Sequence, residues 1–319
     1  MNRIWNLPLV TLQPFDQLED RRPALVVTSG PAWNAVHARL GGLNIAARVE
    51  VSQATVEDWN ASSAGIAAGS IEVVYAIGGG LAVDAAKHLA VRFDRQLVCL
   101  PTALSVDAFL TAASGVRQDG CVRYIETKPP EQLVADFAVL AAAPAGIRAA
   151  GICDVLSIAT GSWDWQFAEQ RGMNPPGMAF IPWVYENARS ILQGALDCAA
   201  AAGAGDPDGL KQLLDCLAME VQLCNQVGHA RPEEGSEHYF AYCVENLAGH
   251  GLPHGDLLAP GLLTMAARQG QDPEPLRRAM QASGVPLERV SPQMQSETLR
   301  CLPAYCRQHN LPYGIAHAL

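Results

Sequence analysis

A run of three glycines is the first feature of this sequence that points to chemistry. Gly78, Gly79 and Gly80 stand between an apolar run and an alanine-rich stretch in AIGGGLAVDAAKHLA, residues 76–90. A strand that leads through glycines into a helix lets the backbone approach a phosphate closely. The helix start then offers unpaired N–H groups and the positive end of the helix dipole. The alternative is a tight turn that needs a positive φ, but three glycines in this setting favour phosphate binding.

Polar side chains near the glycines add to this candidate site. Asp84 and Lys87 are three residues apart and share one face of the expected helix, although this spacing alone is more typical of an exposed ion pair. The following segment PTALSVDAF (101–109) carries three polar residues: Thr102, Ser105 and Asp107. Ligands of open α/β sheets bind at the carboxyl edge of the strands. Hydroxyls there can reach a phosphate or a ribose, and a carboxylate can face a substrate hydroxyl.

The elements that must position these residues alternate between two kinds over the first 145 residues. Short apolar, β-branched runs end in turn residues and span 23–30, 45–52, 72–79 and 96–103. Stretches of helical length, rich in Ala and Leu, lie between them. This alternation predicts a parallel sheet covered by helices.

After about residue 148 the strand signals fade and apolar residues recur at helical spacing. Four such stretches are separated by Gly or Pro: 188–203, 208–227, 237–250 and 255–270. We therefore predict a dinucleotide-binding α/β domain at 1–147, with a mostly parallel Rossmann-like sheet. An all-α metal- and substrate-binding domain follows at 148–319. The segment 199–209, AAAAGAGDPDG, is expected to form a surface loop.

Composition narrows the class of protein. The chain has 319 residues and a net charge of −10, which argues against nucleic acid or an anionic membrane as partner. The sequence contains no apolar stretch long enough to cross a bilayer and no secretion-signal pattern near its start. Nine cysteines without CxxC spacing predict reduced thiols in a cytoplasmic protein. Oligomeric state stays open, and a homo-oligomer is one alternative.

Four motifs occur in a familiar order: GGGLAVDAAK, PTALSVDAF, KPPEQLVADFAVLAAAP and AAGICDVLSIATGSWDW. They resemble the iron-containing alcohol dehydrogenase and dehydroquinate synthase-like superfamily, and within it the sn-glycerol-1-phosphate dehydrogenase group most closely. The shared pattern is GGGxxxDxxK, PTxxSxD, a strand ending in Asp, GxxD at the start of the helical domain and a DW pair. The resemblance runs from about residue 72 to residue 265.

The resemblance implies a metal site in the helical domain. One Asp and two His hold a divalent ion in that family, and the matching positions here are Asp154, His238 and His254. Two imidazoles and a carboxylate suit Zn²⁺, with Fe²⁺ or Ni²⁺ as alternatives, and leave positions open for a substrate. His250 is the rival for the last ligand. The Gly-Asp pair after His254 resembles the family's His-Gly-acid signature and favours His254.

The resemblance also implies a nicotinamide cofactor, NAD or NADP, and a role for each polar residue at the sheet edge. The cofactor-binding set is Gly78, Gly79, Gly80, Asp84, Lys87, Thr102 and Ser105. Two residues are expected to act on the substrate: Asp107 beside the reacting carbons and, less clearly, Lys128, which either faces a substrate phosphate or is a solvated charge. Hydride would pass between cofactor and substrate in a cleft between the two domains, while the metal stabilises the developing alkoxide.

The implied function is a metal-dependent NAD(P)-linked dehydrogenase that interconverts a small polyol or polyol phosphate and its ketone. The first candidate pair is sn-glycerol-1-phosphate and dihydroxyacetone phosphate. The positive partners nominated for a substrate phosphate are Arg231 and Lys128. If neither faces the cleft, an unphosphorylated polyol or a specialised metabolite becomes the better substrate.

Two alternatives are weaker. A sugar-phosphate cyclase of the dehydroquinate synthase type would need several active-site lysines, whereas this chain has three lysines in all, and such cyclases place a glutamate at the position of Asp154. A non-catalytic relative would show broken motifs, and every motif element is present. The first strand ends in TSGPAW without an acid for an adenosine ribose, which leaves NAD against NADP open. The chain is also shorter at its carboxyl end than the family pattern leads us to expect.

Overall fold

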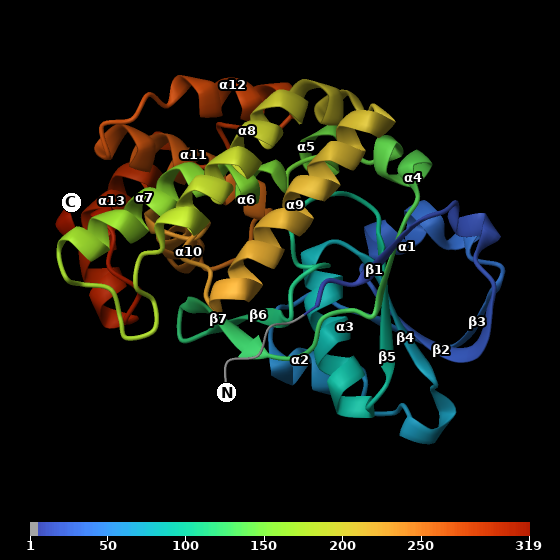
Figure 1. Ribbon diagram of the computed structural model, residues 1–319. Coiled ribbons are helices and arrows are strands. Elements are labelled where there is room, and N and C mark those ends of the chain that lie inside the picture. The colour runs from blue at the N-terminus through green and yellow to red at the C-terminus, as the bar shows by residue number, and fades with distance from the viewer. Residues whose placement is uncertain (1–5) are drawn as a thin grey trace. The chain divides into compact units, whose positions relative to one another are not determined.

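The computed structural model describes residues 6–319, which divide between Ala143 and Pro144 into two compact units (Figure 1). We call the part up to Ala143 the α/β unit and Pro144–Leu319 the helical unit. The expected fold class, an α/β region followed by a helical one, is confirmed. Within residues 6–319, no helix combines the length and the apolar character that crossing a membrane requires.

A six-stranded sheet in which all strands are parallel forms the core of the α/β unit. In spatial order the strands are β1 (Leu9–Leu12), β8 (Gln132–Ala135), β5 (Gln96–Pro101), β4 (Val73–Gly78), β2 (Asp20–Thr28) and β3 (Leu43–Glu50). The four strands predicted from apolar runs are therefore present. Every residue of β4 is buried, because the strand lies inside the sheet and both of its faces are covered.

Helices cover both faces of this sheet. The α/β unit has α1 (Gly30–Val36), α2 (Val56–Ser62), α3 (Gly80–Phe93) and α4 (Phe137–Ala142). Alternate β4 residues such as Tyr75 and Ile77 pack with Val36 of α1 and Val139 of α4. Successive side chains of a strand point to opposite faces, so α3, which contacts β4, β2 and β5, covers the other face.

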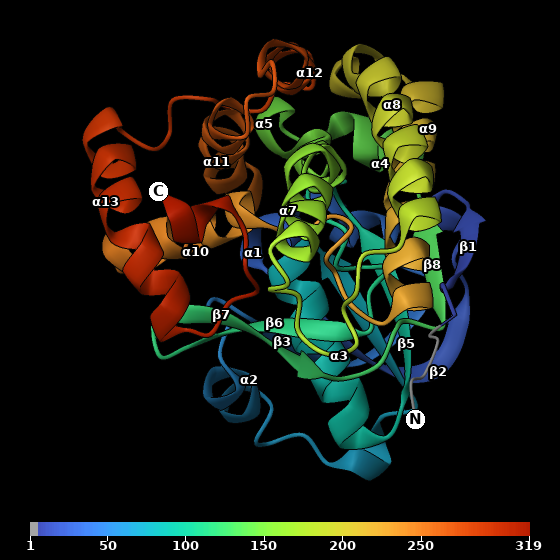
Figure 2. The same ribbon diagram turned by 60° about the vertical axis from the view of Figure 1, so that its left-hand side comes forward.

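A two-stranded antiparallel hairpin, β6 (Ala113–Gln118) and β7 (Cys121–Glu126), was not foreseen from the sequence. Its turn residues Asp119 and Gly120 both have positive φ, of 53° and 72°. An Asp-Gly pair with positive φ at both residues matches the right-handed twist of the flanking strands. Strand β6 packs against α3 (Figure 2), and this contact matters for two charged residues of the candidate site.

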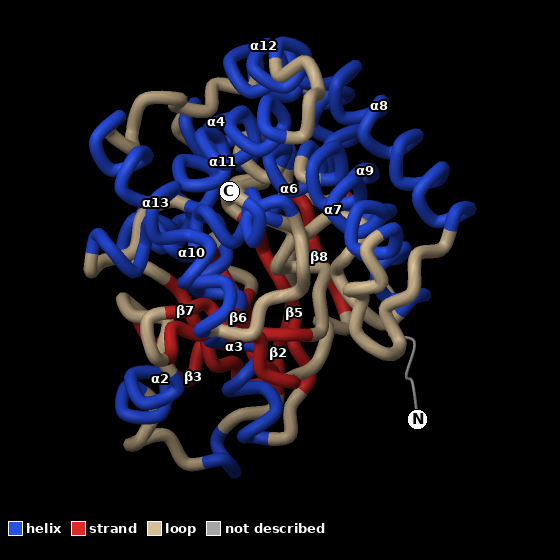
Figure 3. Tube along the Cα trace, turned by 90° about the vertical axis from the view of Figure 1, so that its left-hand side faces the viewer, coloured by secondary structure: helices blue, strands red, loops and turns tan. Residues whose placement is uncertain are grey.

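The helical unit contains no strand among its described residues (Figure 3). Its helices are α5 (Ala145–Arg148), α6 (Ile152–Leu156), α7 (Ile158–Gln170), α8 (Pro182–Ala204), α9 (Pro207–Val227), α10 (Ser236–Ala248), α11 (His254–Arg268), α12 (Glu274–Ala282) and α13 (Pro292–Gln308). The four stretches predicted from helical spacing correspond to α8, α9, α10 and α11.

The predicted surface loop at 199–209 is wrong. The alanine run continues α8 to Ala204, and α9 begins at Pro207. Gly205 ends α8 in the left-handed region with φ 79°, where glycine is the favoured residue. Asp206 caps α9 by accepting a hydrogen bond from the Gly209 amide at 2.9 Å, and Pro207 occupies the first helical turn. Two residues therefore suffice to join the helices.

Candidate metal centre and nucleotide-binding edge

Three side chains that are far apart in the sequence converge in the helical unit. Asp154, His238 and His254 each offer a ligand atom, and these atoms all lie within 4.8 Å of one another. His254 Nε2 is 3.1 Å from Asp154 Oδ1, and the centroids of the two imidazole rings are 5.5 Å apart. Asp154 and His238 are each 5% exposed. Such a donor set can hold one divalent ion about 2.0–2.2 Å from each atom after small side-chain adjustments.

Close backbone packing brings the three residues together. Asp154 lies in α6, His238 in the first turn of α10 and His254 at the first residue of α11. A Cβ on Gly261 of α11 would lie 2.7 Å from the carbonyl oxygen of Glu237, so α10 and α11 approach at a distance that only glycine permits. A Cβ on Gly255 would lie 3.1 Å from that of Ala150, which brings the start of α11 against the segment before α6.

His238 is oriented by the residue before it. Its Nδ1 donates a hydrogen bond to Glu237 Oε1 at 2.9 Å, and Thr160 Oγ1 donates to Glu237 Oε2 at 2.7 Å. Glu237 is fully buried. With Nδ1 engaged in this way, Nε2 keeps its lone pair for a ligand, as is usual for metal-binding histidines supported by a carboxylate.

The surroundings of His238 favour a positive charge. Burial alone lowers the pKa of this imidazole, but the hydrogen bond to Glu237 and the charges of Glu234, Glu237 and Asp154 raise it to about 9. Surroundings that stabilise an imidazolium also stabilise a metal cation in its place. The residues present therefore fit a divalent ion.

The rival residue, His250, lies elsewhere. Its ring is exposed, and its Nδ1 is 3.3 Å from the carbonyl oxygen of Gly251. His254, rather than His250, lies beside Asp154.

In the α/β unit the three glycines lie at a change of direction in the sheet. Strand β3 lies on one side of β2, whereas β4 and β5 follow on its other side. The carboxyl ends of β2 and β4 therefore flank the topological switch point, where open α/β sheets bind ligands. Gly78 ends β4, and α3 begins at Gly80 without a side-chain cap on its first N–H groups. These groups are available to an anion.

Neighbouring protein atoms also exclude side chains at the three positions. Gly78 has φ 143° and would place a Cβ 3.3 Å from that of Ala32. A Cβ on Gly79 would lie 2.9 Å from Ser105 Oγ, and one on Gly80 would lie 3.0 Å from Val106 Cγ2. A tight turn at the glycines and anion binding by their backbone are therefore compatible. The tight turn brings the loop after β5 against the start of α3.

The polar residues of that loop remain candidates for cofactor and substrate binding. Thr102, Ser105 and Asp107 are each partly exposed, and Ser105 Oγ lies next to Gly79. The Thr102 amide donates to the Gly78 carbonyl at 3.4 Å. The Asp107 carbonyl accepts from the Leu110 amide at 2.8 Å, so Asp107 begins a turn at this edge.

Asp84 and Lys87 form a structural ion pair within the α/β unit. Lys87 is 0% exposed, and its Nζ lies 3.0 Å from both Asp84 Oδ1 and Thr111 Oγ1 while also donating to the Ala113 carbonyl. Burial raises the pKa of Asp84, and the charge of Lys87 opposes this shift. The pair joins α3 to β6. A direct contact between Lys87 and a cofactor is therefore not supported, because the ammonium group is enclosed.

The two cations nominated for a substrate phosphate are also engaged. Lys128 donates to the Arg95 carbonyl at 3.1 Å and pairs with Glu131, so it lies at the amino end of β5, opposite the glycine edge. The catalytic role expected for Lys128 is not supported by this position. Arg231 is 2% exposed in the helical unit and donates to the Tyr313 carbonyl at 2.8 Å.

Two kinds of residue escaped the sequence reasoning. Glu50 ends β3, and its Oε1 would lie 2.7 Å from a Cβ on Gly30, the first residue of α1. This acid ends β3, whereas the TSGPAW segment, which has no acid for a ribose, begins at the end of β2. The other set surrounds Glu237 and includes Thr160, Asp164 and Ser236. The only signals for it were an acid directly before a candidate histidine and the acid of the DW pair.

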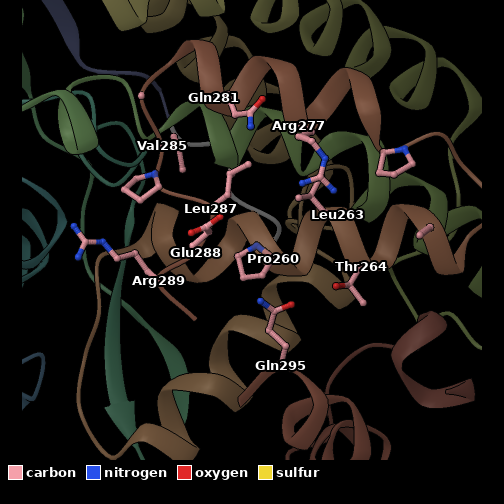
Figure 4. A pocket seen from close by; sticks show the side chains of 14 residues that line it. Pro260, Leu263, Thr264, Arg277, Gln281, Val285, Leu287, Glu288, Arg289 and Gln295 are labelled. Atoms are coloured by element: carbon pink, nitrogen blue, oxygen red, sulfur yellow. The ribbon is translucent and has the colours of Figure 1, made fainter. Parts of the chain in front are cut away.

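A cavity of about 960 Å³ lies in the helical unit (Figure 4). Pro260 and Leu263 of α11, Arg277 of α12 and the segment 284–289 contribute to its lining. None of the three candidate metal ligands lines it.

Comparison with known proteins places the chain in a family. The family model for iron-containing alcohol dehydrogenases matches residues 17–144. The glycerol-1-phosphate dehydrogenase [NAD(P)+] of Sulfurisphaera tokodaii is 30% identical over 238 residues, which are 75% of this chain and 67% of that protein. The enzyme of the same name from Sulfolobus acidocaldarius is 30% identical over 68% of this chain and 61% of its own length. The chain thus spans about three fifths to two thirds of the length of these curated relatives.

Solved structures agree on the fold. A probable glycerol dehydrogenase from Sinorhizobium meliloti superimposes with a TM-score of 0.73 at 18% identity, covering 99% of this chain and 93% of that one. An iron-containing alcohol dehydrogenase from Corynebacterium glutamicum gives a TM-score of 0.66 at 17% identity, with 98% and 92% covered. The chain belongs to the iron-containing alcohol dehydrogenase family.

Proposed function

We propose that this protein is a metal-dependent, NAD(P)-linked dehydrogenase that interconverts a small polyol or polyol phosphate and its ketone. The observation that carries the proposal is the convergence of Asp154, His238 and His254 within 4.8 Å, with Glu237 behind His238. The glycine turn at the switch point of the sheet supports the nucleotide half of the proposal. We predict, in addition, that the metal centre and the glycine turn face each other across a cleft between the two domains.

The chain's own residues supply binding and orientation. The backbone at Gly78–Gly80 and the start of α3 would hold the pyrophosphate of a dinucleotide, with the Thr102 and Ser105 hydroxyls beside it. Asp107 would orient a substrate hydroxyl. A divalent ion held by Asp154, His238 and His254 would supply a Lewis acid for the substrate oxygen, and the nicotinamide would carry the hydride.

The first substrate pair to consider is sn-glycerol-1-phosphate and dihydroxyacetone phosphate, because the curated relatives are named glycerol-1-phosphate dehydrogenases and this ketone is the product of oxidising the secondary alcohol of glycerol-1-phosphate. One observation favours a second candidate, an unphosphorylated polyol or hydroxyketone. Arg231 is buried, and Lys128 lies at the amino edge of the sheet, so neither nominated cation is available for a substrate phosphate. The metal and nucleotide sites are the same for both candidates.

Substitution of the ligands tests the metal assignment. We expect Asp154→Ala and His254→Ala each to abolish bound metal and turnover, because two donors remain where three are needed. His250→Ala is the matched control and should keep both, since His250 is exposed and lies apart from Asp154. Metal content and nicotinamide absorbance are the measurements. Full turnover by a metal-free Asp154→Ala protein would refute the assignment.

A nicotinamide-absorbance screen of the metal-loaded protein separates the substrates. It compares dihydroxyacetone phosphate, dihydroxyacetone and other hydroxyketones with NADH and with NADPH. Oxidation of the cofactor by the phosphorylated ketone alone supports the first candidate, and oxidation by unphosphorylated ketones supports the second. No rate with any carbonyl, together with release of inorganic phosphate from a sugar phosphate, would point to a cyclase instead.

Glu50 leads us to propose NAD(H) as the preferred cofactor. β3 is two strand spacings from β4, so Glu50 lies about 10 Å along the carboxyl edge from the glycine turn. Glu50 is exposed and shares the sheet face of α1. A carboxylate there can accept hydrogen bonds from the adenosine ribose hydroxyls and repels a 2′-phosphate. Arg48, two residues earlier, is engaged over the Trp33 ring at 4.8 Å.

Binding measured by nicotinamide fluorescence tests this preference without turnover. The wild-type protein should bind NADH about 10-fold or more tightly than NADPH, in line with one unfavourable charge contact of about 1.4 kcal/mol. Glu50→Gln should reduce that ratio toward unity. Glu72→Gln removes the same charge from an exposed site at the amino end of β4 and should change nothing. Tighter binding of NADPH by the wild type would overturn the preference and would make Arg48 the candidate partner of the 2′-phosphate.

A further inference from the structure

The end of the chain is fastened to the helical unit at three successive points. We call residues 313–316 the C-terminal turn. The Tyr313 carbonyl accepts from Arg231 Nη2 at 2.8 Å, and the Ile315 amide donates to Asp164 Oδ1 at 2.9 Å. The Ala316 amide donates to Ser236 Oγ at 2.9 Å. These partners are buried, and so are Gly314 and Ala316 of the turn itself.

Asp164 links this turn to the start of α10. Its Oδ2 accepts from the Ser236 amide at 2.8 Å and from the Ser236 hydroxyl, and its Oδ1 accepts from Gln269 Nε2 at 3.1 Å. With the Ile315 amide, four donors converge on one fully buried carboxylate. A buried charge needs such a set of donors to offset the loss of hydration. Asp164 therefore holds Ser236, two residues before His238, in one place.

Glycines make the fit around Asp164 tight. A Cβ on Gly314 would lie 2.3 Å from Asp164 Oδ2, so the C-terminal turn approaches the carboxylate more closely than any other residue allows. A Cβ on Gly235 would lie 2.8 Å from the Gly161 Cα. Both α7, through Gly161, and the C-terminal turn are thus pressed against the residues that begin α10.

From the start of α10 the contacts lead directly to His238. The Gly235 amide donates to Glu237 Oε1 at 2.6 Å, the same oxygen that accepts from His238 Nδ1 at 2.9 Å. Thr160 of α7 holds the other Glu237 oxygen. A shift of Gly235 and Ser236 would therefore move Glu237 and rotate the imidazole. No residue of this chain of contacts except His238 is itself a candidate ligand.

We infer that the C-terminal turn and Asp164 are positioning elements of the metal centre: they hold Gly235 and Ser236 so that Glu237 aims His238 at the ion. The inference rests on the proposed function, because it requires a metal at Asp154, His238 and His254. Outer hydrogen-bond partners of this kind typically contribute about 10–100-fold to metal affinity. Metal affinity, rather than turnover, is therefore the property to measure.

Ile315→Pro removes one donor and little else. Residue 315 is the first of a short 3₁₀ helix, a position where proline fits, and Gly314 before it is extended. The substitution deletes the amide that bonds Asp164. We expect Zn²⁺ affinity, measured by competition with a chromophoric chelator, to fall by about 10–100-fold. Ile315→Val keeps the amide, trims the side chain and should bind Zn²⁺ as tightly as the wild type.

Gly314→Ala tests the same contact sterically, because the added Cβ would clash with Asp164 Oδ2. This variant too should weaken Zn²⁺ binding. Gly146→Ala is its matched control in the helical unit, because a Cβ there meets no atom closer than 3.6 Å. Ser236→Ala is the mildest variant and removes one oxygen between Asp164 and the Ala316 amide. Circular dichroism verifies that each protein folds. The visible spectrum of the Co²⁺-loaded proteins reports coordination geometry and should change only in the variants that weaken binding.

The outcomes separate the inference from the function on which it rests. If the wild type binds no Zn²⁺, or if His254→Ala binds it equally well, the proposed metal centre fails. If the wild type binds one ion that His254→Ala loses, while folded Ile315→Pro and Ser236→Ala proteins bind it with wild-type affinity and spectrum, the positioning role is overturned. Weakened binding with an altered Co²⁺ spectrum in folded variants, and unchanged binding in both controls, supports it.

Discussion

At the scale of single residues, the buried charges fall into two groups that differ in their partners. Lys87 and Arg231 are enclosed; Lys87 Nζ donates to protein oxygens, and Arg231 Nη2 donates to the Tyr313 carbonyl. Around His238, by contrast, the hydrogen bond to Glu237 and the negative charges of Glu234, Glu237 and Asp154 raise the pKa of the imidazole to about 9, against the effect of burial. A concentration of negative charge around a ligand-bearing ring is what a cation site requires. The difference in partners distinguishes a structural charge from a candidate functional one.

Another residue-scale cluster gives a pH-dependent prediction. Asp20 accepts hydrogen bonds from Arg22 and Tyr75, and the Arg22 contact is the main cause that lowers the pKa of Asp20 from 3.8 to about 2. A carboxyl with a lowered pKa in the folded state stabilises the protein above pH 4 and loses this contribution as the pH falls toward 2. Arg22 is 40% exposed, so solvent screening limits the effect at pH 7 to about 1 kcal/mol.

We therefore expect Asp20→Asn to lower the free energy of unfolding at pH 7 by about 1 kcal/mol. The difference from the wild type should shrink steadily as the pH is lowered from 5 toward 2. Urea unfolding of both proteins across this range is the measurement. A difference that stays constant with pH would show that the ionisation of Asp20 contributes nothing.

At the scale of elements, close contacts between secondary structures determine where the candidate groups lie. The Asp84–Lys87 pair joins α3 to β6, and the Ser114 hydroxyl adds a bond to the Asp84 carbonyl at 2.9 Å. Helix α3 begins at the glycine turn, so its contact with β6 also steadies the proposed pyrophosphate site. Gly261 plays the corresponding role between α10 and α11 in the helical unit.

Removal of Lys87 tests the link between α3 and β6. Lys87→Met should lower the free energy of unfolding by about 3 kcal/mol, because it leaves the Asp84 carboxylate and the Ala113 carbonyl without their buried partner. Thermal or urea unfolding measures the loss. Asp84→Asn/Lys87→Met should recover part of it, since no unpaired charge remains. Wild-type stability in the single variant would contradict this account.

At the scale of the whole chain, metal binding and folding are linked. An ion that binds the folded state alone stabilises it by about 2.7 kcal/mol when its free concentration is 100 times the dissociation constant. We expect Zn²⁺ to raise the thermal unfolding midpoint of the wild type and a chelator to reverse the change. His254→Ala should show neither effect. Equal stabilisation of this variant would place the responsible ion elsewhere.

Much of the fold could be read from local sequence patterns. The apolar runs predicted β2, β3, β4 and β5, and helical spacing predicted α8 to α11. The hairpin β6–β7 was missed because its residues show neither a strong apolar run nor strict alternation. The alanine-rich end of α8 was misread as a loop, since glycines and Asp-Pro next to it are also turn signals. Tertiary packing against α9 decided between the two readings.

The amino-acid order alone determined which residue types this chain can use: three glycines after an apolar run, histidines at two motif positions and few lysines. Only the tertiary structure decided which of them meet. In the folded chain, Asp154, His238 and His254 lie together, and Lys87 is enclosed. Lys128 lies at the amino edge of the sheet, whereas Glu50 lies at the carboxyl edge. The physical reason is the distance along the chain over which each kind of interaction acts. Periodicity and turn preferences depend on neighbours within a few residues, whereas burial and convergence depend on packing between elements distant in the chain.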